Sequence, residues 1–416
     1  MKLRVHTVTA VATQVQIARI TSGTAVFRRF NLAMFSAGLA TFALLYAPQP
    51  VLPLLGRAFG ESPVGASLVI SAATLALAVA VIPIASVSEV VGRKPVMIAG
   101  VGVASALGVV VALAPGFGAI LALRALQGVA MAGVPAAAMA HVTEEVEPAA
   151  TGRAMGLYIA GNGVGGMTGR LIVGGVTDLA GWRWGLAAVG VFSFVCAAAF
   201  WALLPRAVAF RPQPARPRAL AASVLSHLRS VRLLRLYLTA FALMGATVTV
   251  YNYIGYRLVA PPFGLSTTAV GLIFLCYLGG SASSTTAGRL ADRFGRRPIA
   301  TIGALGAVGG VCVTLASHLA AVICGLLLFT AGFFACHAVA SGWVGRLATG
   351  ARAQASALYM LAYYLGSSVA GSVGGVAYTH AGWAGTAAFV AGLMVIAVLA
   401  VQLRSRQASP EGHSTR

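Results

Sequence analysis

The sequence predicts an all-α membrane protein with twelve transmembrane helices in two pseudo-symmetric bundles of six. Three observations support this fold class. Of the 416 residues, 59% are apolar and only 9% are charged, which is too few charges to cover the surface of a soluble protein. Apolar runs of about 20 residues, each long enough to cross the hydrocarbon layer, occur twelve times. A short charged motif is present twice, about half a chain length apart.

The predicted spans follow one another at short intervals, except in the middle of the chain. They cover residues 31–54, 65–87, 96–114, 117–140, 154–177, 184–204, 236–259, 268–290, 298–316, 319–341, 354–378 and 383–403. A stretch rich in proline and arginine follows the sixth span and predicts a linker with an interfacial helix near 224–234. The expected parts are an N-terminal tail (1–29), a first bundle (30–204), a central loop (205–233), a second bundle (234–403) and a C-terminal tail (404–416).

Basic residues are distributed unevenly among the loops. Of 29 lysines and arginines, 23 fall on the side that holds both chain ends and the central loop, and three on the opposite side. The positive-inside rule therefore predicts a multi-pass inner (plasma) membrane protein with both termini in the cytoplasm. Residues 1–29 lack an apolar core followed by a cleavage site, so we expect a tail and not a signal peptide. The net charge of +21 then reflects topology and lipid contact, not nucleic-acid binding.

The residue inventory excludes several classes of function. The chain has only two lysines, Lys2 and Lys94, and no Gly-Lys-Ser/Thr phosphate loop, which excludes an ATP-driven pump on this chain. The five cysteines lie in apolar runs without a Cys-x-x-Cys pair, so we expect no disulfide, no metal and no other cofactor. No nucleophile–base–acid set is apparent, and an enzyme is therefore not expected.

A motif in which an acid is followed by a glycine and two adjacent bases occurs at 85–94 and again at 288–297. A second repeat, at an offset of 201 residues, matches the fifth span with the eleventh, for example at Gly165 and Gly366. Repetition at half the chain length is the construction of many secondary transporters. The sequence therefore predicts a duplicated bundle with a transport function.

The second copy of the motif matches, at every position, the signature of the major facilitator superfamily between helices 8 and 9. The first copy departs from it, with Ala85 where the family has glycine and Glu89 where it has aspartate. The resemblance extends from about Phe30 to Leu403. It implies the major facilitator fold and a secondary transporter that works by alternating access.

Three further sets of residues indicate which group within the superfamily the chain resembles. Residues 124–128 (Arg-Ala-Leu-Gln-Gly) resemble the Arg-x-x-Gln-Gly signature of helix 4. The glycine-rich run 161–169 resembles the helix 5 signature of the drug:proton antiporter group. Residues 251–257 and 333–337 are most similar to the acriflavine-sensitivity branch of that group. The resemblance implies an efflux antiporter that exchanges its substrate for protons.

The charged motif can serve as a gate or as a topology signal. Its acid can pair with the positive N-terminal end of a helix from the other half, a contact of ~0.3–2 kcal/mol, and its bases can bind anionic headgroups. The resemblance implies that the first acid latches the cytoplasmic face; a topology determinant without a conformational role is the alternative. The candidate gating residues are Glu89, Gly92, Arg93, Lys94, Gly288, Asp292, Gly295, Arg296 and Arg297.

Small residues at every fourth position give the fifth and eleventh spans a smooth stripe. The candidate packing residues are Gly161, Gly165, Gly169, Gly366 and Gly374. Such stripes permit close helix approach, and the eighth span offers a matching small surface at 279–288. We expect the stripes to serve the contact between the halves, where small side chains would let the halves slide.

Polar residues inside the spans are candidates for substrate binding or coupling. Tyr158, Asn162 and Arg170 share one face of the fifth span, and Arg170 replaces the proline of the antiporter signature. Arg124 and Gln127 lie one turn apart on the fourth span. A charge near the bilayer centre costs at least ~2.5–3.5 kcal/mol and commonly marks a water-filled path. The alternatives are an arginine bonded to backbone carbonyls and one that snorkels to the interface.

The second half contributes a histidine and several aromatic residues. His337 is the only histidine predicted well inside a span, and its unperturbed pKa of about 6.5 would suit a proton relay. A hydrogen bond to a neighbouring helix, without a role in coupling, is the alternative. The remaining candidates are Tyr251, Asn252, Tyr363 and Tyr364. Their rings suit an amphipathic organic ligand, and an interfacial aromatic belt explains tyrosines near span ends equally well.

No aspartate or glutamate falls in the middle of a predicted span. Protons would therefore ride on His337, on Asp178 near the outer mouth or on the substrate, or transport is uncoupled. Arginines without acids disfavour multivalent cations, so the predicted substrate is a small organic solute that is neutral or anionic. We expect a monomer that exports this solute. A transporter-like membrane receptor or scaffold without flux is the alternative.

Overall fold

The computed structural model describes residues 19–210, 212, 217–348 and 352–403. Their secondary structure is helical, apart from an isolated bridge between Ile20 and Val146. The first half contains α1 (Ala25–Leu45), η1 (Gln49–Val51), α2 (Leu52–Phe59), α3 (Pro63–Val91), α4 (Arg93–Ala112), α5 (Phe117–Met131), α6 (Gly133–Glu145), α7 (Pro148–Ala180) and α8 (Trp182–Leu203). The second half contains α9 (Pro217–Leu228), α10 (Val231–Val259), α11 (Thr267–Leu272), η2 (Ile273–Leu275), α12 (Cys276–Phe294), α13 (Arg296–Val313), α14 (Leu319–Leu347) and α15 (Arg352–Gln402).

These helices supply the twelve spans, and the predicted fold class is confirmed. Nine helical stretches of the described residues are long and apolar enough to cross a membrane. One of them, Gln354–Gln402, holds two spans that meet at the non-helical residues Ala381 and Gly382. Two more helices complete the set. α7 is less apolar because it carries many glycines and Arg170, and α13 because its 18 residues begin with two arginines.

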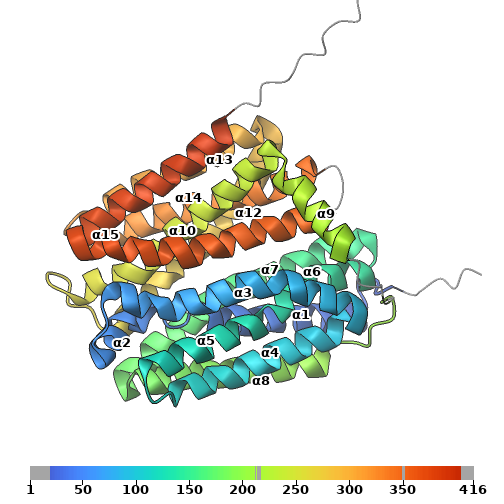
Figure 1. The fold of residues 1–416 in the computed structure, drawn as a ribbon, viewed down its shortest axis with the longest axis horizontal. Coiled ribbons are helices and arrows are strands. Elements are labelled where there is room, and N and C mark those ends of the chain that lie inside the picture. The colour runs from blue at the N-terminus through green and yellow to red at the C-terminus, as the bar shows by residue number, and fades with distance from the viewer. Residues whose placement is uncertain (1–18, 211, 213–216, 349–351, 404–416) are drawn as a thin grey trace, which may run out of the picture.

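The spans form two bundles that lie side by side (Figure 1). α1 to α8 make one bundle and α10 to α15 the other, and α3 meets α15, as α7 meets α11, across the boundary. One end of both bundles holds the start of α1, the α3–α4 turn, α9 and the α12–α13 turn; we call it the terminus end. The opposite end, with the α7–α8 turn and the start of α11, is the far end.

The glycine stripes pack within each half and not between the halves. A Cβ built on Gly165 would lie under 3.0 Å from the backbone carbonyl of Leu39 on α1, and one on Gly366 equally close to that of Phe241 on α10. The expectation that the helix 5 stripe faces the small surface of helix 8 is therefore wrong. Backbone-to-backbone contact of this kind makes each half a rigid unit.

The central loop is held to the first half at the terminus end. The buried carboxylate of Glu145 accepts hydrogen bonds from the backbone N–H groups of Val208 (2.9 Å) and Ala209 (3.1 Å). The predicted interfacial helix near 224–234 is wrong in its bounds, since α9 ends at Leu228 and α10 begins at Val231.

Candidate functional site

Helix 1 is interrupted inside the first bundle, where two prolines follow the end of α1 at Leu45. Proline has no N–H, so the last carbonyls of α1 lose their helical partners. The buried Arg124 of α5 replaces them: it donates to the carbonyls of Leu44 (3.1 Å) and Leu45 (2.6 Å), and from Nε to that of Val69 on α3 (3.0 Å). Arg124 therefore joins three helices of the first half.

Gln127 completes this arrangement. Its Oε1 accepts a further hydrogen bond from Arg124, and its Nε2 donates to the Ala104 carbonyl (2.9 Å). All three guanidinium nitrogens of Arg124 are thus engaged by protein oxygens. These contacts correspond to the backbone-bonded alternative for this arginine.

Arg170 of α7 is just as deeply buried, with 2% of its surface exposed, but it is held differently. It donates from Nε to Gln49 Oε1 (2.7 Å) and from Nη1 to the carbonyl of Gly166 (2.6 Å). Three rings surround its guanidinium carbon at 4.5, 5.0 and 5.1 Å, those of Phe274, Tyr277 and Tyr46. Cation–π contacts contribute about 0.5–2 kcal/mol each, so the cation is stabilised without an acid.

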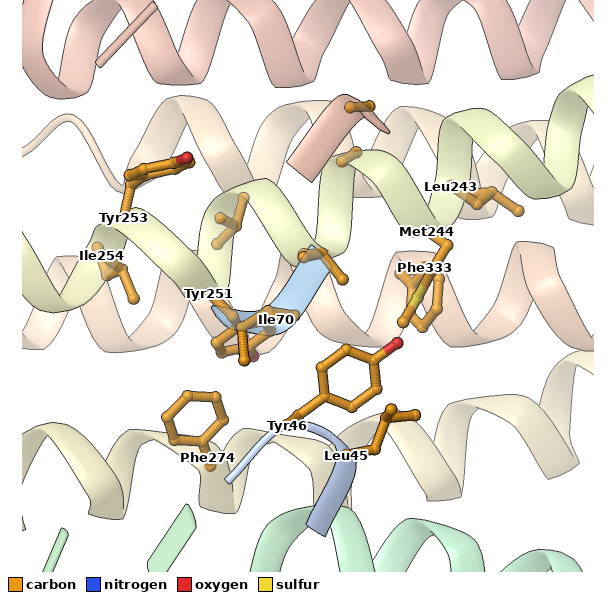
Figure 2. Packing of buried hydrophobic residues seen from close by; sticks show 14 of the residues in the cluster. Leu45, Tyr46, Ile70, Leu243, Met244, Tyr251, Tyr253, Ile254, Phe274 and Phe333 are labelled. Atoms are coloured by element: carbon orange, nitrogen blue, oxygen red, sulfur yellow. The ribbon is translucent and has the colours of Figure 1, made fainter. Parts of the chain in front are cut away.

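This cluster joins the two halves. Tyr46 comes from the break in helix 1 and lies close to Tyr251 and Phe274 of the second half (Figure 2). Gln49, from the same break, donates from Nε2 to Asn252 Oδ1 on α10 (2.8 Å). A cation of the first half is therefore enclosed by groups of both bundles.

A series of rings continues from the arginine towards the terminus end. Neighbouring centroids lie 5.5 Å apart for Tyr277 and Phe334, 5.0 Å for Phe334 and Phe333, 5.7 Å for Phe333 and His337, and 4.9 Å for His337 and Tyr363. All of them except Phe333 are only half-buried, although they lie inside the helices and contact one another. The series thus leaves surface for a ligand.

Polar atoms accompany the rings. His337 Nδ1 forms a hydrogen bond with the Tyr359 hydroxyl (3.0 Å), and the Tyr251 hydroxyl with Thr330 (2.6 Å). Two buried atoms here have no hydrogen-bond partner among the described residues, namely Asn252 Nδ2 and the Tyr364 hydroxyl. Both can donate a hydrogen bond to a ligand.

The structure places Tyr158 and Asn162 in the packing of the first half. Tyr158 is buried in the core of the first half. Asn162 lies against α1, where its Oδ1 would come under 3.0 Å from a Cβ at Gly38. The shared face of helix 5 therefore divides: Arg170 reaches the boundary between the halves, and the two residues nearer the terminus end pack on helix 1.

A second histidine, His141, lies near the end of a span. α6 extends to Glu145, beyond the predicted end of its span, and His141 is consequently buried within it at 1% exposure. The His141 ring lies 5.5 Å from that of Phe30. This histidine belongs to the packing of the first half.

Four residues of the cluster were not among the sequence candidates, namely Tyr46, Gln49, Phe274 and Tyr277. A signal for the first two was present, because a proline-interrupted apolar segment is a pointer to a binding site. No comparable signal marks Phe274, which lies within the 3₁₀ helix η2, or Tyr277, which follows it.

The two copies of the charged motif are held by residues of opposite sign. In the first copy Arg93 donates to Glu144 of α6 (3.2 Å) and lies 3.8 Å from Glu89. In the second copy Asp292 pairs with Arg346 of α14 (3.5 Å). Neither motif acid forms a hydrogen bond or ion pair with the opposite half in the described part of the chain.

The remaining motif residues shape the turns. Gly92 and Gly295 have φ of 116° and 92°, which favours glycine at both positions. Lys94 donates to the carbonyls of Leu204 (2.7 Å) and Pro205 (3.0 Å) at the end of α8. In the second copy Arg296 lies 4.0 Å from Asp292, Arg297 lies over the Trp343 ring, and Gly288 has open space around it.

Polar contacts between the halves concentrate towards the far end. Asp178 of α7 accepts hydrogen bonds from the backbone N–H groups of Thr267 (3.1 Å) and Thr268 (2.7 Å) at the start of α11. Ser71 of α3 forms a hydrogen bond with Ser372 of α15 (2.7 Å). The far end is thus closed by direct contacts.

Comparison with known proteins agrees with this architecture. The profile of the Major Facilitator Superfamily matches residues 32–259 and 237–415. The chain is 45% identical over 380 residues to the inner membrane transport protein YnfM of Escherichia coli (strain K12), covering 91% of both chains. It is 40% identical over 379 residues to the uncharacterized MFS-type transporter YybF of Bacillus subtilis (strain 168), covering 91% of this chain and 94% of the relative.

A solved structure shares the fold. A bacterial homologue of the human lysosomal transporter Spinster, in an inward-facing and occupied conformation, matches with a TM-score of 0.72 at 17% identity, covering 91% of this chain and 95% of that one. The resemblance predicted from the motifs is confirmed, as is the expectation of a membrane transporter and not an enzyme. The chain belongs to the major facilitator superfamily.

Proposed function

We propose that the chain exports small organic solutes across a bacterial inner membrane, as a monomer, by alternating access and in exchange for protons. One observation carries the proposal: Arg170 is a buried cation between the two bundles, with rings around it and no ion pair to an acid of the described residues. A neutral or anionic solute suits this site, because a cation would be repelled in a low-dielectric environment.

The direction of access follows from the orientation that we propose. With the terminus end in the cytoplasm, the contacts of Asp178 and Ser71 lie on the periplasmic side. A solute would then reach Arg170 from the cytoplasm along the ring series that begins at Tyr363. In the proposed export cycle, this is the state in which the solute enters from the cytoplasm.

Purified protein in proteoliposomes tests the proposal. We expect saturable flux of neutral or anionic solutes, and faster flux when a pH gradient is imposed. Ligands that stabilise the protein in a thermal-shift assay but are never transported would favour a receptor or scaffold. Robust efflux of a permanent cation such as ethidium would contradict the proposed substrate charge.

Replacing Asp178 with asparagine should open the far end. An exposed carboxylate at a helix start contributes about 0.3–1 kcal/mol, so the far-end-open population should rise roughly two- to fivefold. Spin-label distances between α2 and the end of α10 measure this population. Glu61→Gln, at the same end but outside these contacts, is the control. Unchanged distances in Asp178→Asn would contradict a latch.

The Asp178 latch should not respond to pH near neutrality. Partial burial raises the pKa of its carboxyl, but hydrogen bonds from Thr268, Ser266 and Thr267 outweigh this and hold the pKa below its ordinary value. A lowered pKa means that the contact persists above about pH 4 and is lost only as the pH falls through the lowered value. The spin-label distances of the wild type should therefore be equal at pH 6 and pH 8.

Neutralising the two motif acids should have unequal effects. Both side chains are exposed, and exposed pairs contribute only about 0–1 kcal/mol, so Glu89→Gln and Asp292→Asn should both fold. Glu89→Gln should slow flux several-fold more, because the superfamily resemblance assigns the latch to the first copy. Melting temperature and flux separate the two effects. Complete loss of expression in both variants would show that the motifs serve assembly alone.

Replacing His337 with alanine should flatten the pH dependence of flux. Its ring lies in the series that leads to Arg170, and its Nδ1 has a hydrogen-bond partner in Tyr359. Flux measured between pH 5.5 and pH 8 provides the test, with His380→Ala as control because His380 is exposed on α15. An unchanged pH profile in His337→Ala would assign the proton to another carrier.

A further inference from the structure

We propose that the substrates are small aromatic monocarboxylates, with the carboxylate bound to Arg170 and the ring placed among the adjacent aromatic side chains. The inference rests on the transport function proposed above and specifies its substrate class. Three independent features carry it: the unpaired charge, the direction of the hydrogen bonds and the rings.

The first feature is the difference between the two buried arginines. All three guanidinium nitrogens of Arg124 donate hydrogen bonds to oxygens of the protein. Arg170 donates from Nε and Nη1 to oxygens of Gln49 and Gly166, and the Tyr277 hydroxyl also interacts with its guanidinium, but no carboxylate of the described residues pairs with it. A planar guanidinium binds carboxylates with short, charge-assisted hydrogen bonds. Arg170 is therefore the buried arginine that can receive an anion.

The second feature is the direction of the hydrogen-bond chain. Arg170 can only donate, so Gln49 must present Oε1 to it and Nε2 to Asn252, which then must present Oδ1. Both amide oxygens accept a hydrogen bond in this way. The chain ends in Asn252 Nδ2, which is fully buried and unpartnered, and the unpartnered Tyr364 hydroxyl can also donate.

This direction selects among polar groups. A carboxylate only accepts hydrogen bonds, whereas an amide, an amine or a protonated acid also carries donors that need acceptors. Arg170 and the free Nδ2 donor of Asn252 favour a carboxylate, whereas the unpartnered Tyr364 hydroxyl, which both donates and accepts, can serve either kind of group. An amide, an amine or a protonated acid has further donors, and each donor left unpaired in a buried site lowers affinity. A second carboxylate would gain no comparable cation, since Arg124 is fully engaged. One carboxylate per ligand fits the groups present.

The third feature is the aromatic surface that adjoins the cation. Phe274, Tyr277 and Tyr46 contact the guanidinium, and the half-buried Phe334 and Tyr363 extend the surface towards the terminus end. Rings prefer edge-to-face or offset contacts at about 4.5–7 Å, the range in which these side chains already contact one another. A ligand ring can join the series, and an aliphatic chain would gain less.

A panel of four probes on the purified protein separates charge from ring. The probes are benzoate, its uncharged isostere benzamide, the non-aromatic cyclohexanecarboxylate and the cation benzylammonium. Competition against radiolabelled benzoate should show benzoate at least tenfold tighter than benzamide, several-fold tighter than cyclohexanecarboxylate, and benzylammonium without effect. Equal affinity for benzoate and benzamide, or a preference for benzylammonium, would overturn the inference.

Two variants locate the effect. Arg170→Gln should remove the preference for benzoate over benzamide, and Phe274→Leu should remove the preference for benzoate over cyclohexanecarboxylate while keeping the charge preference. Phe274→Leu also serves if Arg170→Gln does not fold, and Arg352→Gln, at the exposed start of α15, is the surface control. A wild-type preference pattern in Phe274→Leu would contradict the role of the rings.

Benzoate counterflow in proteoliposomes distinguishes failure of the inference from failure of the transport function. Exchange of labelled benzoate with the predicted preferences supports both. Binding with these preferences but without exchange would contradict the transport function and support the site. Exchange of other solutes with no preference for benzoate would contradict the site and support transport.

Discussion

Leucine in place of Gly165 should abolish transport and sharply reduce the amount of folded protein. α7 and α1 meet backbone to backbone at this glycine, and a Cβ there would lie under 3.0 Å from the Leu39 carbonyl. A backbone oxygen cannot rotate away, so the helices must separate. Even where side chains can shift, overpacking a core costs about 1–3 kcal/mol. Separation would also displace Tyr46 and Gln49, which follow α1 and hold Arg170.

Size-exclusion chromatography of the detergent extract measures the folded fraction, and proteoliposome flux measures the activity. Gly156→Leu is the matched control, because Gly156 lies on the same helix with nothing within 4 Å of its Cβ position; it should behave as wild type. Gly366→Leu, the equivalent change in the second half, should be as harmful as Gly165→Leu. Wild-type stability and flux in Gly165→Leu would show that α1 and α7 are not in contact there.

Alanine in place of Arg124 should also abolish transport, but by releasing the broken end of helix 1. The carbonyls of Leu44, Leu45 and Val69 would lose their donor, and each buried polar group left unsatisfied costs about 1–3 kcal/mol. Arg124→Lys should rescue little, because a single ammonium cannot reproduce the planar fork.

The loss of transport expected in Arg124→Ala from disruption of helix 1 must be distinguished from a loss of contact with the substrate. Because Arg124 is fully engaged within the first half, the folded remainder of Arg124→Ala should keep the wild-type order of solute preference and lose maximal flux. Arg352→Ala, at an exposed position, should leave both unchanged. A changed order of preference together with normal thermal stability would contradict the structural role and place Arg124 in the substrate path.

The architecture was predictable because hydropathy and the repeated motif each report it independently. α7 shows the value of the repeat, since it is less apolar than most of the other spans and its match with the first span of α15 supports it independently. For Arg124 the sequence predicted a role in a water-filled path, hydrogen bonds to backbone carbonyls or snorkelling, but it could not select among them. It does not show which carbonyls lack a helical partner at a break.

The sequence could not predict which residues contact the glycine stripe and Arg170. A stripe of small residues indicates that another helix packs closely against it, but it does not identify that helix. Gly165 contacts α1 and not α12. The rings of Phe274 and Tyr277 become partners of Arg170 only through the contact between halves. Contacts between side chains of distant helices produce no periodic pattern in a single sequence, so they cannot be predicted from it.

The opposite charges that hold the two motif copies have a consequence for how a duplicated protein becomes asymmetric. Glu144 takes up the base Arg93 and leaves Glu89 the freer member of the first copy. Arg346 takes up the acid Asp292 and leaves the bases of the second copy. Two hairpins with the same acid–glycine–double-base pattern thereby offer a freer acid on one half and a surplus of bases on the other, at the same end of the molecule. After duplication, the division of labour between the copies is set partly in the motif, which carries Arg289 and Arg293 only in the second copy, and partly by one neighbouring residue of opposite sign in each half.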